Sequence, residues 1–165
     1  MATIDLALRP GNGQHPTFAG NFRKVYVSQR DLNLATAATT KGSALAAADV
    51  IEIIDLPPHS VVLGATVQVT SVMTGTSTDA TIDVGVTGID PDAFVDGMDL
   101  DAATLNSYGA QPAAYQPIVI GATADTLDVL IATQTGTITG GVLRVTAIIA
   151  DVTDDQAPGL APLKS

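Results

Sequence analysis

The stretch that decides the fold is residues 49–86, which read DVIEIIDLPPHSVVLGATVQVTSVMTGTSTDATIDVGV. Apolar residues alternate with polar or small ones through residues 61–69 and again through 80–86. Because successive side chains of a strand point to opposite faces, this period of two predicts strands with one buried face. The proline pair at 57–58 and the polar run at 74–78 interrupt the alternation as turns. The stretch therefore predicts three β-strands joined by two turns.

One face of each predicted strand carries the apolar side chains and is expected to be buried. In the second strand these side chains occupy the odd-numbered positions, Val61, Leu63, Ala65, Val67 and Val69. In the third strand they are Ile82, Val84 and Val86. A meander of three strands cannot bury such a face alone, so the rest of the chain must supply a second apolar layer.

The C-terminal third of the chain supplies that layer. Apolar residues alternate at Leu127, Val129 and Ile131, and then at the odd positions of residues 143–149. The even positions of this last strand are Arg144, Thr146, Ile148 and Ala150. They are less polar than a solvent-exposed face requires, so we expect the strand to be covered on both sides, either by the N-terminal arm or by another subunit.

The remaining segments complete an all-β architecture. Residues 23–34 contain one or two edge strands, whereas residues 35–48, rich in Ala and Thr, form either a loop or a short helical turn. Residues 106–116, with Gly, Pro and two Tyr, are expected to be an exposed loop. Short strands with frequent turns predict an antiparallel β-sandwich that is jelly-roll-like, with about 7–8 strands.

The sandwich is expected to carry an extension at each end. Residues 1–22 contain Pro and Gly without a sustained period, which predicts an extended N-terminal arm. Residues 23–152 form the β-sandwich domain, and the acidic, Pro-bearing residues 153–165 form a flexible C-terminal tail. Phe18 and Phe22 either anchor the arm to a partner or fold back onto their own domain.

The composition excludes several classes of protein. Hydrophobic residues make up 46% of the 165 residues but aromatic residues only 4%, so the core must be built from Val, Ile, Leu and Ala. The absence of cysteine excludes disulfides and thiolate sites. No run of about 18 apolar residues is present to span a membrane, and the N-terminus lacks the pattern of a secretory signal. We expect a soluble chain made in the cytoplasm.

The net charge of −10 is unevenly distributed. Residues 1–30 hold Arg9, Arg23, Lys24 and Arg30 against Asp5, a balance of +3, and the remainder holds three basic and sixteen acidic residues, a balance of −13. Such asymmetry marks either an arm with its own partner or simply a soluble chain end. The acidic body argues against nucleic acid as a partner, because like charges repel.

Acidic residues are concentrated between residues 88 and 105, namely Asp90, Asp92, Asp96, Asp99 and Asp101. Calcium takes about six to eight oxygen ligands, largely carboxylates, so these residues are calcium candidates. The helix–loop–helix calcium pattern is not matched, because no Glu closes it. Asp-Pro and Asp-Gly also form turns, which is the alternative explanation. We expect Phe94, Val95, Met98 and Leu100 to attach this segment to the sandwich.

Catalytic patterns are missing from the sequence. The two histidines, His15 and His59, lie far from any nucleophile motif, and a His or Cys metal cluster is impossible with this inventory. No glycine-rich phosphate loop precedes a helix. Paired carboxylates occur, but sugar-cleaving clefts usually need aromatic platforms and there is no tryptophan. The sequence predicts a non-enzymatic protein without cofactor or metal.

Parts of the chain resemble a family of small head proteins of tailed bacteriophages, often encoded beside the major capsid protein. The similar passages are DVIEIIDLPPHSVVLGATVQV, TDATIDVGVTGIDPDAFVDGMDLDA, ADTLDVLIA and GGVLRVTAIIADV. They contain a Leu-Pro turn at 56–57, an Ala-Thr-Ile-Asp-Val-Gly strand at 80–85 and an Asp-Pro-Asp…Val-Asp-Gly segment at 90–97. The resemblance covers roughly residues 48–152, and the arm lies outside it.

The resemblance implies a capsid decoration, or cement, protein. Such proteins bind the outer surface of the expanded shell as trimers or other small oligomers, and they hold neighbouring capsid subunits together against the pressure of packaged DNA. The implied partners are the major capsid protein and further copies of the chain, as a homotrimer, without membrane or nucleic acid. The protein would then lie on the outer capsid surface of the virion, after synthesis in the host cytoplasm.

Two groups of residues are candidates for these contacts. The capsid-contact candidates are Arg9, Phe18, Phe22, Arg23 and Lys24. The oligomer-interface candidates are Tyr108, Tyr115, Arg144 and Ile148. The main alternative is a phage tail or fibre module that binds a host glycan, aided by calcium at the aspartate cluster. A secreted adhesion or surface-layer module is disfavoured by the missing signal sequence.

Overall fold

A computed structural model gives the structure of the chain, and it describes residues 3–5 and 24–152. This part contains one helix, α1 (Leu34–Lys41), and nine strands. The strands are β1 (Thr3–Asp5), β2 (Lys24–Asn33), β3 (Val50–Leu56), β4 (Ser60–Gly75), β5 (Asp79–Val86), β6 (Asp90–Asp99), β7 (Ile118–Val119), β8 (Asp125–Thr135) and β9 (Ile138–Asp151).

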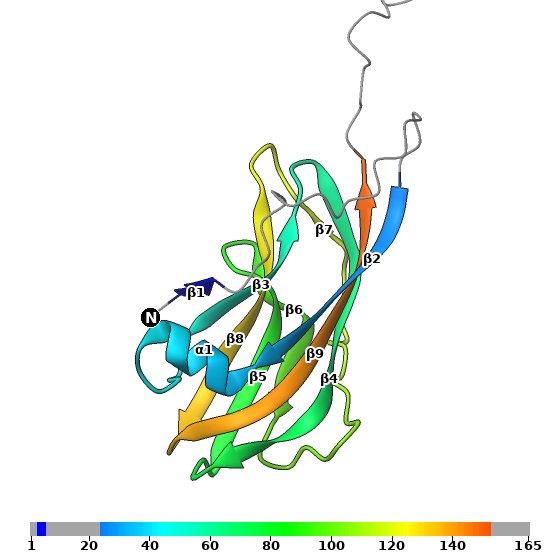
Figure 1. The fold of residues 1–165 in the computed structure, drawn as a ribbon. Helices are drawn as coiled ribbons and strands as arrows, with labels where there is room; N and C mark the ends of the chain where they lie inside the picture. The colour runs from blue at the N-terminus through cyan, green and yellow to red at the C-terminus, as the bar shows by residue number, and fades with distance from the viewer. Residues whose placement is uncertain (1–2, 6–23, 153–165) are drawn as a thin grey trace, which may run out of the picture.

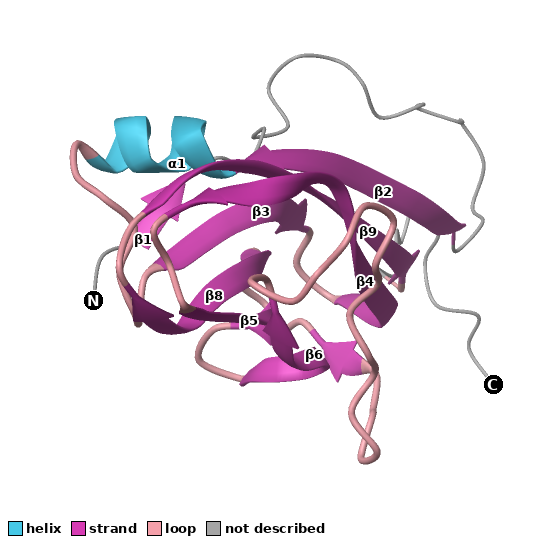
Figure 2. Cartoon of the chain, turned by 90° about the horizontal axis from the view of Figure 1, so that it is seen from below, coloured by secondary structure: helices cyan, strands magenta, loops and turns pink. Residues whose placement is uncertain are grey.

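The strands form two sheets that pack face to face (Figures 1 and 2). The five-stranded sheet has the order β1-β3-β8-β5-β6, and the four-stranded sheet has the order β2-β9-β4-β7. From β2 onward the antiparallel pairs are nested, since β2 pairs with β9, β3 with β8, β4 with β7 and β5 with β6. This nested order is jelly-roll-like and confirms the predicted all-β antiparallel sandwich. The ninth strand, β1, pairs parallel to β3.

The core lies between the two sheets and consists almost entirely of aliphatic side chains, as the composition predicts. The predicted apolar positions of β5, β8 and β9 are all buried, namely Ile82, Val84, Val86, Leu127, Val129, Ile131, Leu143, Val145, Ala147 and Ile149. Phe94 is the one fully buried aromatic side chain among the described residues. The jelly-roll core is thus filled by branched aliphatic side chains, which suit the pleated surface of a sheet.

The predicted alternation of β4 is wrong in its first part. Val62 is fully buried, whereas Leu63 is 38% exposed and Val61 is half-buried. The register against β9 shifts between Val62 and Gly64, so an extra residue is inserted in β4 there. A β-bulge of this kind changes which face the following side chains occupy. Beyond the bulge, Ala65, Val67 and Val69 are buried as predicted.

Helix α1 occupies the segment for which the sequence allowed either a loop or a helical turn. Asn33 caps its N-terminus by accepting a hydrogen bond from the Thr36 backbone N–H at 3.1 Å. Gly42 ends it in the left-handed conformation, with φ of 77°. Leu34 and Ala37 face the core. No helix in the described ranges is long and apolar enough to cross a membrane.

The acidic segment after β5 forms a strand, β6, although its Asp-Pro and Asp-Gly pairs favour turns. It pairs antiparallel with β5, with register shifts that accommodate its Pro and Gly. Phe94, Val95, Met98 and Leu100 are buried, which confirms that they attach this segment to the sandwich.

Two separate segments form hydrogen bonds with the edge of β4 that does not pair with β9. β7 pairs with its first residues, Val61 and Val62. Further along, the backbone N–H of Val69 donates to Ser107 O at 2.9 Å, and that of Gly109 donates to Val67 O at 3.0 Å. The loop at 106–116 was predicted to be exposed, and its first part thus satisfies an otherwise open edge.

A candidate interaction face on the four-stranded sheet

Charge is segregated between the two sheets. The sequence contains no Lys or Arg from residue 42 to residue 143, and β3, β5, β6 and β8 all come from this range. The acidic residues of these strands are Glu52, Asp55, Asp79, Asp83, Asp90, Asp92, Asp96, Asp99, Asp125 and Asp128. The five-stranded sheet therefore carries negative charge without a basic residue in those four strands.

The calcium candidates at the end of β6 organise the backbone. Asp99 Oδ1 accepts hydrogen bonds from the backbone N–H groups of Asp101 and Ala102, at 2.8 and 3.0 Å. Asp101 Oδ2 accepts a hydrogen bond from the Ala80 N–H. These contacts hold the chain as it leaves β6, which is the turn-forming role that Asp commonly has.

The other carboxylates of β5 and β6 lie near one another. Asp83 Oδ1 accepts a hydrogen bond from the Gly97 N–H at 2.7 Å, but burial, together with the nearby Asp96 and Asp92, raises the pKa of Asp83. A hydrogen bond shared with Asp92 raises the pKa of Asp90. Across residues 3–5 and 24–152, no three acidic or histidine side chains are gathered so as to hold a metal ion.

The outer face of the four-stranded sheet differs from the acidic five-stranded sheet, because half of the residues on that outer face are apolar. In one row across the sheet Val25 lies opposite Ala150, Ala150 opposite Val61, and Val61 opposite Val119. In the next row Val27 lies opposite Ile148, and Ile148 lies opposite Gly64, beside the bulge. We call this set the apolar half, consisting of Val25, Val27, Val61, Leu63, Val119, Ile148 and Ala150.

Several side chains of the apolar half are strongly exposed. Val25 and Val27 are each 64% exposed, Val119 is 66% exposed and Ile148 is 44% exposed. Their strand neighbours point into the core, since residues 118, 147 and 149 are buried. The exposure is therefore a property of this face, and four strands contribute to it.

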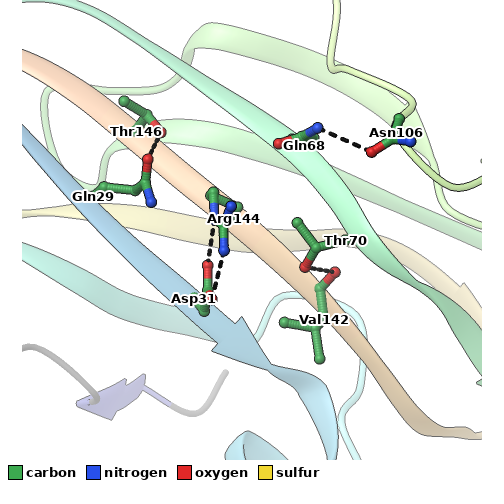
Figure 3. Close-up of polar contacts among 8 residues, drawn as sticks. All are labelled: Gln29, Asp31, Gln68, Thr70, Asn106, Val142, Arg144 and Thr146. Carbon is green, nitrogen blue, oxygen red and sulfur yellow. Dashed lines mark hydrogen bonds and ion pairs between the residues drawn. The ribbon is translucent and has the colours of Figure 1, made fainter.

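Further along the same face the rows become polar (Figure 3). Gln29 lies opposite Thr146 and Asp31 opposite Arg144, while Thr66 and Gln68 continue these two rows in β4. We call these six residues the polar half. The Arg144 guanidinium donates through Nε and Nη2 to the two carboxylate oxygens of Asp31, at 2.8 and 3.0 Å. Gln68 Nε2 donates to Asn106 Oδ1 at 3.2 Å.

The Asp31–Arg144 pair removes net charge from the face. The hydrogen bonds from Arg144 lower the pKa of Asp31, and Asp31 in turn raises the pKa of Arg144. Both groups therefore stay ionised together over the whole neutral range. The other members of the apolar and polar halves are uncharged, so the face is neutral on a chain of net charge −10.

The structure distributes the predicted oligomer-interface residues over two places. Arg144 and Ile148 lie on the outer face of β9, as predicted from their alternation. Tyr108 is 61% exposed, and its backbone forms an isolated antiparallel β-bridge with Gln68 at the margin of the polar half. Tyr115 lies apart from them, half-buried, with its ring centroid 6.0 Å from that of Phe94.

Lys24 is the one predicted capsid-contact residue that lies within the described residues. Arg9, Phe18, Phe22 and Arg23 lie outside the described residues. Lys24 is the first residue of β2, and its backbone lies opposite Asp151.

Four exposed residues of the apolar half were missed as site candidates, namely Val25, Val27, Leu63 and Val119. Val25 and Val27 alternate with Tyr26, a pattern that shows they share a face. The alternation does not say that this face is the outer one, because that depends on pairing with β9.

Comparison with known proteins adds a fold relationship. No protein-family model and no curated protein matches the chain. A chain of the solved capsid of Ralstonia phage GP4 is 20% identical and has a TM-score of 0.58, over 90% of this chain and 99% of that one. This chain shares the fold of a phage capsid chain. A chain of the cyanophage Pam1 capsid asymmetric unit is 18% identical with a TM-score of 0.56, over 87% and 99%.

The matched share of each capsid chain shows how far the common fold extends. Nearly the whole of each capsid chain is matched, so the shared fold extends over almost the full length of both chains. The match also spans most of the present chain.

Proposed function

We propose that this chain is a structural virion protein, a capsid decoration or cement protein that binds the outer surface of a tailed-phage head and stabilises the shell. The observation that carries the proposal is the fold shared with chains of two phage capsids over almost their entire length. The passages that resemble head decoration proteins fall in the strands and connections of this same sandwich. The partners are the major capsid protein and further copies of the chain, as a trimer.

The chemistry of the chain supports a mechanical role, without enzymatic activity. The described residues contain a single histidine, His59, in the turn between β3 and β4. The carboxylates of β5 and β6 bind backbone N–H groups or lie beside one another. A protein of this kind stabilises a lattice through many modest contacts, and engagement by several linked copies multiplies their effect.

The arm is proposed to make the contact with the shell through Arg9, Phe18, Phe22, Arg23 and Lys24. The first thirty residues carry a balance of +3, opposite in sign to the body. An extended, basic, Phe-bearing segment can reach across a boundary between capsid subunits while the acidic sandwich stays outside.

The deciding experiment is co-sedimentation of the purified protein with undecorated heads, in expanded and unexpanded form. Saturable binding to expanded heads alone is the expected result, and expanded heads should then resist heat or loss of packaged DNA better when decorated. Failure to bind either form would reject the decoration role. Binding to host glycans, abolished by a chelator, would then identify the fibre module instead.

The arm is tested with two truncations. Deletion of residues 1–22 is expected to abolish co-sedimentation while leaving a folded sandwich. This deletion also removes β1, which pairs with β3, so deletion of residues 1–5 is the matched control and should retain binding. Equal decoration by the longer truncation and the full chain would show that the arm is not the contact. Thermal melting of both variants reports on the fold.

A further inference from the structure

The apolar half of the outer face is not explained by the proposed contact between the arm and the shell. It places exposed Val and Ile side chains from β2, β7 and β9 in adjacent rows of one sheet. Single exposed apolar residues are ordinary on soluble proteins, but a contiguous group marks a surface that is covered by something. The polar half borders it at one end of the same face, so the face combines apolar and polar contacts as protein–protein interfaces do.

The charge pattern selects the kind of partner. The five-stranded sheet would attract a basic partner, because β3, β5, β6 and β8 carry acidic residues and no Lys or Arg. The four-stranded face offers no such attraction, because Asp31 and Arg144 neutralise each other. Its partner must therefore be neutral and apolar. A second copy of the chain presents such a surface and keeps both acidic sheets pointing away from the contact.

The face is large enough to form most of such a contact. β2 has ten residues, which span about 34 Å at about 3.4 Å per residue. The strands β2, β9 and β4, about 4.8 Å apart, make the face about 14 Å wide, and β7 adds only two residues, so the projected area is about 520 Å². A stable protein–protein interface buries about 800 Å² on each partner. The face supplies about two thirds of that area before the neighbouring loops are included.

We propose that this outer face is the self-association surface of the protein, with Val25, Val27, Val119 and Ile148 as its exposed apolar part, packed against another copy of the chain. The contact buries apolar side chains that are otherwise exposed to water, which is the main favourable contribution to association. This inference rests on the self-association that the proposed function includes, and it is tested on its own because self-association is measured without heads. Co-sedimentation with heads then tests the capsid role separately.

The first test compares oligomeric state by sedimentation velocity and light scattering. The full chain is expected to be an oligomer, and the Val27→Asp and Ile148→Asp variants are expected to be monomers, because each places a charge in the apolar half. Ile89→Asp is the matched control, since Ile89 is 53% exposed in the connection between β5 and β6, away from the face. It should remain an oligomer. A monomeric full chain, or oligomers of unchanged mass in both face variants, would overturn the proposal.

The second test does not require a disruptive change. The chain contains no cysteine, so a Val27→Cys variant and an Ile89→Cys variant each carry one thiol. Alkylation is expected to be several-fold slower at position 27 than at position 89 in the oligomer, and equally fast at both in denaturant. Equal rates in the native protein would contradict the proposal. Protection at position 27 that arises only on heads would assign the face to the shell, which also overturns it.

A variant that fails to fold would be recognised by circular dichroism and replaced by the Val25→Thr, Val27→Thr double variant. Threonine keeps the β-branched shape that favours strands and changes only polarity. This variant is expected to weaken association at low protein concentration. Association as strong as that of the full chain would count against the proposal.

Discussion

Asp128 shows how a single residue of the five-stranded sheet affects stability. It is only 3% exposed in β8, and its carboxylate accepts hydrogen bonds from the Thr87 N–H at 3.0 Å and the Thr126 hydroxyl at 2.6 Å. Burial raises its pKa despite these bonds. The folded state therefore holds a proton that the unfolded chain releases at an ordinary Asp pKa of about 3.9.

The raised pKa of Asp128 determines the direction in which the free energy of unfolding changes with pH. As pH rises from about 4 through the raised pKa of Asp128, its contribution to the free energy of unfolding falls, because the folded state binds more protons than the unfolded state. We predict that Asp128→Asn loses this fall and gains stability relative to the natural chain as pH rises from about 4 through the raised pKa of Asp128. Urea denaturation across this range measures the difference. A difference independent of pH would contradict the prediction.

Residue-scale prediction from the sequence succeeds where a strand is regular. The buried positions of β5, β8 and β9 follow from a period of two. In β4 the same reasoning assigns Val61 and Leu63 to the core in place of Val62, because the bulge before Gly64 changes the phase. A bulge is defined by the partner strand, and the sequence of one strand does not reveal it.

At the scale of elements, the β5–β6 pair depends on a close backbone approach. A Cβ atom on Gly85 would lie 2.2 Å from the carbonyl oxygen of Asp90 and 2.5 Å from the carbonyl carbon of Pro91. We predict that Gly85→Ala separates the two strands and lowers the free energy of unfolding by about 1–3 kcal/mol.

Gly121 provides the matched control for this substitution. A Cβ atom there meets nothing within 4 Å, and the backbone conformation is ordinary. Gly121→Ala should therefore change stability by less than about 0.5 kcal/mol. Chemical denaturation of the two variants gives the comparison, and equal losses would mean that the Gly85 contact is not tight.

Elements differ in how well the sequence predicts them. The three strands β3, β4 and β5 follow from residues 49–86 with two turns, as expected. The sequence of β6 does not indicate a strand, because its Asp, Pro and Gly favour turns, but burial of Phe94 and Val95 outweighs local preference. The Ala- and Thr-rich segment of α1 has no strong preference, and tertiary packing of Leu34 and Ala37 determines it.

At the scale of the whole molecule, charge segregation predicts how salt affects self-association. Two copies of net charge −10 repel each other, and the neutral outer face offers no attraction to compensate. Raising the salt concentration from about 0.1 M to about 1 M shortens the Debye length from about 10 Å to about 3 Å. We predict that the dissociation constant of the oligomer falls over this range, as measured by sedimentation equilibrium. An oligomer that dissociates in salt would instead be held by opposite charges.

The candidate site was only partly predictable from the sequence. The outer face of β9, with Arg144 and Ile148, was found because its alternation is too apolar for an open surface. Val25, Val27 and Val119 come from β2 and β7, which are distant in the sequence. Their placement beside β9 depends on strand order and register, and these are properties of the nested fold.

The pairing of β2 with β9 also determines how the molecule responds to tension. Lys24 lies opposite Asp151, so the chain enters the first strand of this pair beside the point where it leaves the second (Figure 1). A pulling force between these two points acts on the paired residues of β2 and β9 one pair after another, so their hydrogen bonds break in sequence. A force parallel to the strands would act on all ten residue pairs at the same time. The sandwich is therefore mechanically weak when it is pulled by its own two ends, and it resists best when gripped elsewhere.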